Sequence, residues 1–295
     1  MQELLNAVTL GSVYLLFALG MSLTWGTIDI LNFSHGAIFM FASFSAYLML
    51  EHSALSLGLL ILLGMIAGAA LSFLVQFVVF EPILRRSKDK GSAEIQVLIG
   101  GIGTGMILLA IAQHKTRSNP FGLNGSSTES TTWHWGGAHI TDVAVLTIVV
   151  AISLWLVVGW WLRRSRQGLA LRAIGVDADV AALMGIDRRG LAMVTMAISG
   201  ALAGLAGILF TFLQVAITPE SGDTLLLKAF ACIVLGGVGS MAGVAFGAFL
   251  LAGAETVLLT RTDGSWVDAI SFGLIVLVLL IRPSGMFGRA EVRRT

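Results

Sequence analysis

The sequence has little charge and almost no cysteine. Asp, Glu, Lys and Arg make up 12% of its 295 residues, whereas a soluble domain carries about 25%. Hydrophobic residues make up 56%, and the mean hydropathy is +0.90. The 18 basic and 17 acidic side chains nearly cancel, so no overall field would attract nucleic acid. The composition excludes a soluble globular protein and predicts one that lies in the membrane.

The single cysteine, Cys232, lies within an apolar stretch. Without a second cysteine, neither a disulfide framework nor a Cys-based metal site is available. His35 is alone in its segment and makes no metal site either. The opening Met1-Gln2-Glu3 has no basic region, and no Ala-x-Ala-like cleavage signal follows it. We therefore expect no bound metal and no removable signal peptide.

Recognisable catalytic motifs are also missing. No glycine is followed by lysine anywhere in the sequence, so a phosphate-binding loop of the form G-x-x-x-x-G-K-[ST] cannot be built. The patterns G-x-S-x-G and H-E-x-x-H, which mark hydrolytic enzymes, are absent too. We therefore expect a chain without enzymatic activity and without a cofactor of its own. Any ATP and Mg²⁺ would be bound by partner subunits.

The sequence does contain a long series of apolar segments. Crossing a hydrocarbon core of ~30 Å takes about 20 helical residues, and these segments lack the alternating pattern of a barrel strand. They predict an all-α fold: a polytopic transmembrane helical bundle of about eight or nine segments, some broken or re-entrant, forming one domain over residues 1–295. The segments are 4–24, 30–50, 57–80, 95–112, 142–162, 191–215, 224–238, 241–259 and 267–281.

Glycine pairs predict how some of these helices pack. Gly64 and Gly68 lie four residues apart, as do Gly200 and Gly204. Small residues at this spacing let two helices approach closely.

The basic residues between the segments predict the orientation, because cytoplasmic loops are enriched in Lys and Arg. The connection over residues 113–141 is rich in Ser, Thr and Trp and has few basic residues, so we expect it to be extracytoplasmic. The N-terminus would then lie outside and the C-terminus in the cytoplasm. The basic groups are Arg85, Arg86, Lys88 and Lys90; Arg163, Arg164, Arg166, Arg172, Arg188 and Arg189; and Arg282, Arg289, Arg293 and Arg294.

The cytoplasmic loop over residues 163–190 contains a short predicted helix. Asp177 can cap its N-terminus, residues 178–184 favour a helix, and Gly185 suits the position just after it. On spacing alone, the pattern fits equally well a helix that docks onto a partner and a connector on the membrane surface. The apolar side of the helix would consist of Ala181, Ala182, Leu183 and Ile186.

Several motifs in the same order resemble the permease subunits of branched-chain amino acid ABC importers, specifically the H-type permease. The resemblance covers nearly the whole chain. Its motifs are Gly11–Gly20, Ile30–Gly36, Glu81-Pro82, Gly168–Ile186, Lys228-Ala-Phe-Ala, Leu235–Ser240 and Arg282–Gly288.

The resemblance implies a role for the cytoplasmic loop. In that family a Glu-Ala-Ala motif forms a short helix that docks into a groove on the ATPase and transmits its closure. The matching positions are Asp179, Val180 and Ala181, followed by Gly185; Asp keeps the charge, while Val adds bulk to the docking helix. The coupling residues implied here are Arg172, Gly175, Asp177, Asp179, Ala181 and Gly185.

Three polar or irregular features lie within apolar segments. Asn32, Ser34, His35 and Gly36 place an amide, a hydroxyl and an imidazole together; they would either line a solute path or satisfy carbonyls freed at a kink. Gly236, Gly237 and Gly239 would break the helix and produce a reversal or re-entrant bend. Glu255 must face the bundle interior, where it pairs or takes up a proton. These eight residues are the candidate translocation path.

The resemblance implies a transport function. We expect a permease of the bacterial inner membrane that translocates branched-chain or related amino acids by alternating access. Its partners would be a second, M-type permease subunit, two ABC ATPase subunits, an extracytoplasmic amino-acid-binding protein and membrane lipid, but not nucleic acid. The alternatives are an ABC permease for urea or amides and an autonomous ion-coupled secondary transporter, with Glu255 or His35 as the ion site.

Overall fold

The computed structural model describes residues 1–29, 31–87, 89–123, 126–127, 131–135 and 138–261, together with residues 269, 273, 276, 280, 282 and 285–287. Helices account for most of this part of the chain. In order, the elements are α1 (Gln2–Ile28), α2 (His35–Leu50), α3 (Leu57–Val75), the π-helix η1 (Gln76–Phe80), α4 (Glu81–Arg86), α5 (Lys90–Thr116), β1 (Thr132–Trp135), β2 (Ala138–Thr141), α6 (Asp142–Arg164), α7 (Arg166–Ile174), α8 (Ala178–Leu183), α9 (Arg188–Leu213), α10 (Ser221–Gly236) and α11 (Met241–Arg261).

The predicted all-α transmembrane bundle is confirmed. Within the described ranges, six helical stretches are long and apolar enough to cross a membrane, and α2 is a shorter apolar helix of 16 residues. α3, η1 and α4 together form one such stretch of 30 residues. The predicted segment over residues 267–281 lies largely outside the described residues, as do Lys88, Arg289, Arg293 and Arg294.

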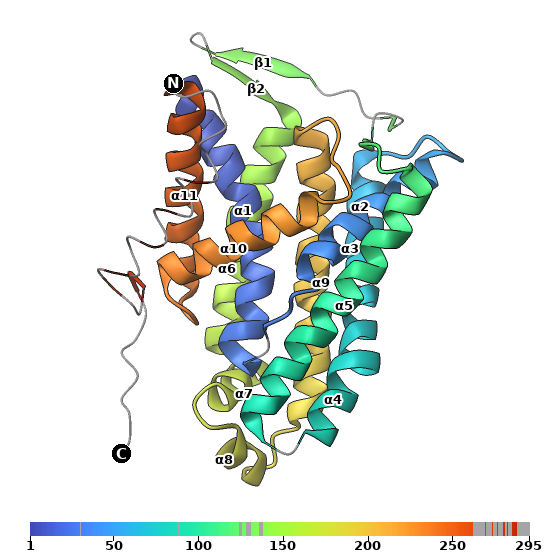
Figure 1. Cartoon of the computed structure of the whole chain (residues 1–295). Helices are drawn as coiled ribbons and strands as arrows, with labels where there is room; N and C mark the ends of the chain where they lie inside the picture. The colour runs from blue at the N-terminus through green and yellow to red at the C-terminus, as the bar shows by residue number, and fades with distance from the viewer. Residues whose placement is uncertain are drawn as a thin grey trace.

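Helices α1 and α9 form the centre of the bundle. α9 packs against α1, α2 and α3, while α1 also contacts α6, α10 and α11 (Figure 1). Aromatic side chains fill the space between α1 and α2, where the rings of Phe17 and Phe39 lie 5.1 Å apart. Both side chains are fully buried, so the contact between α1 and α2 belongs to the core of the bundle.

The predicted close approach of glycine-containing helices occurs between α3 and α9. A Cβ atom on Gly200 would lie 2.2 Å from the carbonyl oxygen of Gly68, and one on Gly204 would lie 2.0 Å from that of Gly64. No side chain fits at these positions without movement of the backbone. The two helices therefore meet backbone to backbone.

The two ends of the bundle differ. α4, α7 and α8 lie at one end with Arg85, Arg86, Arg163 and Arg164, which we call the basic end (Figure 1). At this end the Asp89 carboxylate caps α5 by accepting a hydrogen bond from the Ser92 amide, which lowers the pKa of Asp89. At the other end, the hairpin end, β1 and β2 form an antiparallel pair beside the N-terminus.

Candidate functional site

The loop between α6 and α9 carries the predicted short helix. The Asp177 carboxylate accepts a hydrogen bond from the Val180 amide at 3.0 Å, which caps α8, and Gly185 has a φ of +82° just beyond its end. The predicted cap, helix and terminating glycine are therefore confirmed. Asp187 caps the next helix, because its carboxylate accepts hydrogen bonds from the amides of Arg189 and Gly190, both at 3.1 Å.

Helix α8 projects from the basic end, and apolar side chains on it and on the residues that flank it are exposed. Val176, Leu183 and Met184 are 88%, 87% and 79% exposed, whereas Ala181 is 3% exposed and faces the protein (Figure 1). The exposed apolar side thus differs from the predicted one, since Ala181 packs inward. Residues 176–184 thus carry three exposed apolar side chains around one capped helix.

Helix α7 was not predicted and supports the loop. Ser165 caps it by accepting a hydrogen bond from the Gly168 amide at 2.9 Å. Arg172 donates to the Arg163 carbonyl oxygen at 3.3 Å, which ties α7 to the end of α6. Gly175 ends α7 with ordinary right-handed geometry. The side chain of Asp179 lies outside the described part of the structure.

The polar residues before α2 form a turn rather than helix. The Asn32 Oδ1 atom accepts hydrogen bonds from the Ser34 amide at 3.0 Å and the Ser34 hydroxyl at 2.6 Å. Such local bonding competes with helix formation, so α2 begins only at His35 within the predicted segment 30–50. The Asn32 Nδ2 atom is buried and has no hydrogen-bond partner in the described structure.

His35 connects three helices. Its Nε2 atom lies 3.2 Å from the Phe17 carbonyl oxygen, which can only accept, so Nε2 carries the proton and Nδ1 accepts from the Ser199 hydroxyl at 3.4 Å. Beside it, a Cβ atom on Gly36 would lie 2.3 Å from the Gly222 carbonyl oxygen. The start of α2 is therefore packed against α1, α9 and the start of α10.

The predicted glycine break is a reversal between α10 and α11. Gly237 and Gly239 have φ angles of +98° and +78°, which glycine adopts at little cost. Gly236 touches the backbone of Gly243, where an added Cβ would lie 2.1 Å from the carbonyl oxygen.

A distant motif closes the end of α10. The amides of Met286 and Phe287 donate to the carbonyl oxygens of Leu235 and Gly236, both at 2.9 Å. The last carbonyls of a helix have no partner within it, so the segment around residues 285–287 supplies donors that α10 lacks.

Glu255 forms a buried cluster with two residues that the sequence did not single out. Lys228 Nζ lies 3.0 Å from Glu255 Oε2, and the Tyr14 hydroxyl donates to the same oxygen at 2.6 Å. Lys228 also donates to the Tyr14 hydroxyl at 3.1 Å. Pairing of Glu255 within the bundle, one of the two predicted outcomes, is thus confirmed. Lys228 was the detectable signal, because it is the one basic residue inside the apolar segment 224–238.

The start of α2, helix α10 and Glu255 lie close together, whereas the loop that carries α8 lies apart from them. On α1, Tyr14 contacts Glu255, and Phe17, less than one turn further on, contacts His35. On α10, Gly222 packs against Gly36, and Lys228 donates to Glu255. The loop with α8 lies at the basic end (Figure 1). All of the polar side chains at the start of α2 are buried, so a solute could touch them only after a change of conformation.

At the hairpin end, the connection over residues 113–141, which was predicted to lie outside, is joined to the connection before α10. Phe121 and Ile217 exchange backbone hydrogen bonds of 2.9 Å in both directions. Gln113 donates to the Glu220 carboxylate at 2.6 Å, which lowers the pKa of Glu220. The connection over residues 113–141 and the one before α10 therefore form one surface.

Comparisons with known proteins show the family to which the chain belongs. Residues 3–279 match the family described as branched-chain amino acid transport system, permease component. The chain is 30% identical to LivH, the high-affinity branched-chain amino acid transport system permease protein, of Salmonella typhimurium and of Escherichia coli. It is 31% identical to BraD, a protein of the same description, from Pseudomonas aeruginosa. Each comparison covers 100% of this chain and 97% of the relative.

Proposed function

The chain belongs to the family of branched-chain amino acid transport system permease components, and we propose that it is the H-type permease subunit of an ATP-driven importer. It carries branched-chain or related amino acids across the bacterial inner membrane by alternating access. The observation that supports this most directly is the capped helix α8 at the basic end, where Leu183 on the helix and Val176 and Met184 beside it are exposed.

The ATPase subunits dock on the loop over residues 163–190. Exposed apolar side chains on a short, doubly terminated helix give a rigid contact, because Asp177 and Gly185 fix both of its ends. The ATP and Mg²⁺ belong to those subunits. The two ATPases require two such loops, so a second permease subunit of the M-type stands beside this one.

Helix α9 transmits movement of the loop into the membrane. It begins directly after Asp187 and runs along α1, α2 and α3. Ser199 of α9 contacts His35 at the start of α2. A shift of α8 is therefore transmitted by the single helix α9 to the polar turn at Asn32. This turn, α10 and the Gly236–Gly239 reversal line the solute path when the path opens.

The extracytoplasmic amino-acid-binding protein docks at the hairpin end. The surface formed by residues 113–141 and the connection before α10 is held together by the Phe121–Ile217 bridge. It lies at the opposite end of the bundle from α8 (Figure 1), as an importer requires.

Affinity purification of the intact chain from its own cells tests the ATPase contact. We expect a protein with a phosphate-binding loop to be recovered. Leu183→Asp should reduce its recovery on the order of tenfold, because it puts a charge where the ATPase would cover an apolar side chain. The control is Leu4→Asp, which changes a side chain 67% exposed at the opposite end. Recovery of no ATPase, or equal recovery with both variants, contradicts the proposal.

Uptake into cells distinguishes the alternatives. ATP-dependent uptake of leucine that excess isoleucine or valine blocks, and urea does not, is expected. An ion-coupled carrier would instead lose uptake when an ionophore collapses the gradient while ATP is maintained. The contact of Glu255 with both Lys228 and Tyr14 favours a structural role over that of an exchanging ion site.

A further inference from the structure

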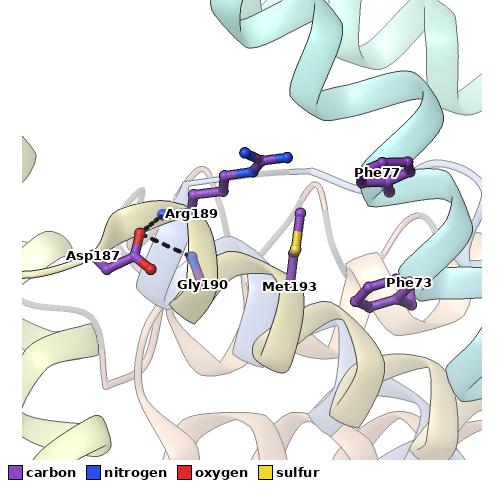
Figure 2. Close-up of a pocket in the computed structure, with 6 residues that line it drawn as sticks. All are labelled: Phe73, Phe77, Asp187, Arg189, Gly190 and Met193. Carbon is purple, nitrogen blue, oxygen red and sulfur yellow. Dashed lines mark hydrogen bonds between the residues drawn. The ribbon is translucent and has the colours of Figure 1, made fainter.

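A hollow of about 360 Å³ opens between the end of α3 and the start of α9, at the basic end. Figure 2 shows Phe73 and Phe77 on one side of it and Met193 on the first turns of α9 opposite them. Phe73 and Phe77 are 41% and 49% exposed. The walls are therefore largely apolar and open outward, away from the centre of the bundle.

Two arginines share one carboxylate at the rim of the hollow. Arg85 Nε and Arg189 Nε lie 2.7 Å and 3.1 Å from the same oxygen of Glu81. Their side chains remain 59% and 45% exposed. Arg86 and Arg188 are exposed next to them. Arg85 and Arg189 thus share one carboxylate, and each has a second exposed arginine beside it in the chain.

One further acidic side chain, Asp187, lines the hollow. Its carboxylate accepts hydrogen bonds from the amides of Arg189 and Gly190 at the start of α9. The positive end of the helix dipole offsets part of its charge. Residues 81–86 and 187–190 together carry four arginines and two carboxylates, so these two segments keep a positive charge in excess.

The hollow lies where apolar surface gives way to charge. Along α3 and η1, Leu62, Ile66, Phe73 and Phe77 are exposed, as is expected of side chains that face lipid. The same helical stretch ends at Arg85 and Arg86, and α9 begins at Arg188. This change marks the level of the lipid head groups, where basic pockets between helices recognise anionic lipids.

We propose that the hollow binds an anionic phospholipid from the leaflet at the basic end. An acyl chain lies against Phe73, Phe77 and Met193, and the head-group phosphate interacts with Arg85 and Arg189. The volume is within the range of ligand pockets, roughly 300–1,000 Å³. A neutral lipid could fill the same apolar walls but would leave the excess positive charge without a counterion.

The bound lipid would stabilise the end of the loop over residues 163–190, where α9 begins. Asp187 and Arg189, at the hollow, follow α8 and Gly185 directly in the chain. A lipid between α3 and α9 would hold the first turn of α9 in place, so the position of α8 would depend on the membrane composition. Binding itself requires no ATPase, so it can be measured on the isolated chain whether or not the proposed transport function is correct.

Native mass spectrometry of the full chain tests the proposal. The purified protein is incubated with equal amounts of phosphatidylglycerol and phosphatidylcholine that have the same acyl chains. We expect phosphatidylglycerol to be retained in preference, and Arg85→Gln with Arg189→Gln to reduce that preference on the order of tenfold, since a basic residue near an anionic lipid contributes about 1 kcal/mol. Equal retention of the two lipids by the unaltered protein overturns the proposal and needs no variant.

Two further variants locate the site. Arg163→Gln with Arg164→Gln removes the same charge at the same end, away from the hollow, and should keep the preference. Met193→Trp fills the hollow without changing charge and should weaken retention of both lipids. An equal loss of preference in both double variants, or unchanged retention with Met193→Trp, contradicts a site in the hollow. A protein that copurifies with the intact chain and is lost only with Arg85→Gln and Arg189→Gln would show a protein interface there instead.

Discussion

The loop over residues 163–190 exposes apolar side chains, whereas the centre of the bundle buries charged ones. At the basic end, Leu183 and Met184 are apolar and almost fully exposed. In the bundle, Glu255 is 1% exposed and contacts Lys228 and Tyr14. The buried charges have their partners within the chain, whereas the exposed apolar side chains have none among the described residues. The ion pair in the bundle is therefore internal to the chain, whereas the proposed ATPase contact rests on the exposed apolar side chains of the loop.

Removing one side of the buried pair should have the largest effect on stability. Lys228→Met leaves the Glu255 carboxylate buried without its cation, which typically costs about 3–5 kcal/mol. We expect a correspondingly lower free energy of unfolding in detergent micelles, followed by tryptophan fluorescence. Copurification of the ATPase should fall only in proportion to the loss of folded protein.

The matched control replaces both members of the pair. Lys228→Met with Glu255→Leu removes both charges, and such a replacement is often neutral or stabilising. We expect it to recover most of the lost stability. A double variant as unstable as Lys228→Met alone would mean that the unpaired Glu255 carboxylate is not the cause of the lost stability.

The contact between α3 and α9 should give the next largest effect. In Gly204→Ala the new Cβ would lie 2.0 Å from the Gly64 carbonyl oxygen, and overpacking of this kind costs about 1–3 kcal/mol. Gly103→Ala is the control, because nothing lies within 4 Å of its added Cβ. Equal unfolding free energies for the two variants would show that α3 and α9 do not meet backbone to backbone.

The smallest effect on stability is expected in the loop, where the effect on partner binding should be large. Gly185→Ala places an L-residue at a φ of +82°, which costs roughly 1–2 kcal/mol. Because only α8 ends there, unfolding of the bundle should hardly change, while ATPase recovery falls. Gly159→Ala, where nothing lies within 4 Å of the added Cβ, should leave ATPase recovery unchanged. A loss of bundle stability with Gly185→Ala would show that α8 is part of the core.

Local signals predicted the loop well. Asp177, the helix formers after it and Gly185 act over a few residues, and the structure has the cap, the helix and the positive φ at these positions. Helix α7 was missed because its arginines suggested only a basic connection. Ser165, which caps it, was the available signal.

Contacts between distant residues could not be read in the same way. Hydropathy located the apolar segments, but Lys228 and Tyr14 meet Glu255 only because α1, α10 and α11 pack together. The late start of α2 depends on the Asn32 side chain, whose turn overrides an apolar run. The hollow at the start of α9 is lined by Phe73 and Phe77 from one stretch of the chain and by Met193 from a distant one, so no local pattern predicts it.

The two hydrogen bonds that cap the C-terminal end of α10 have a consequence for biosynthesis. The amides of Met286 and Phe287 that bond to Leu235 and Gly236 are translated after the whole of α11. During synthesis, α10 therefore enters the membrane with these two carbonyls unsealed. The two carbonyls gain these donors only once the later segment has emerged from the ribosome, so the end of α10 is completed after α11 has been made.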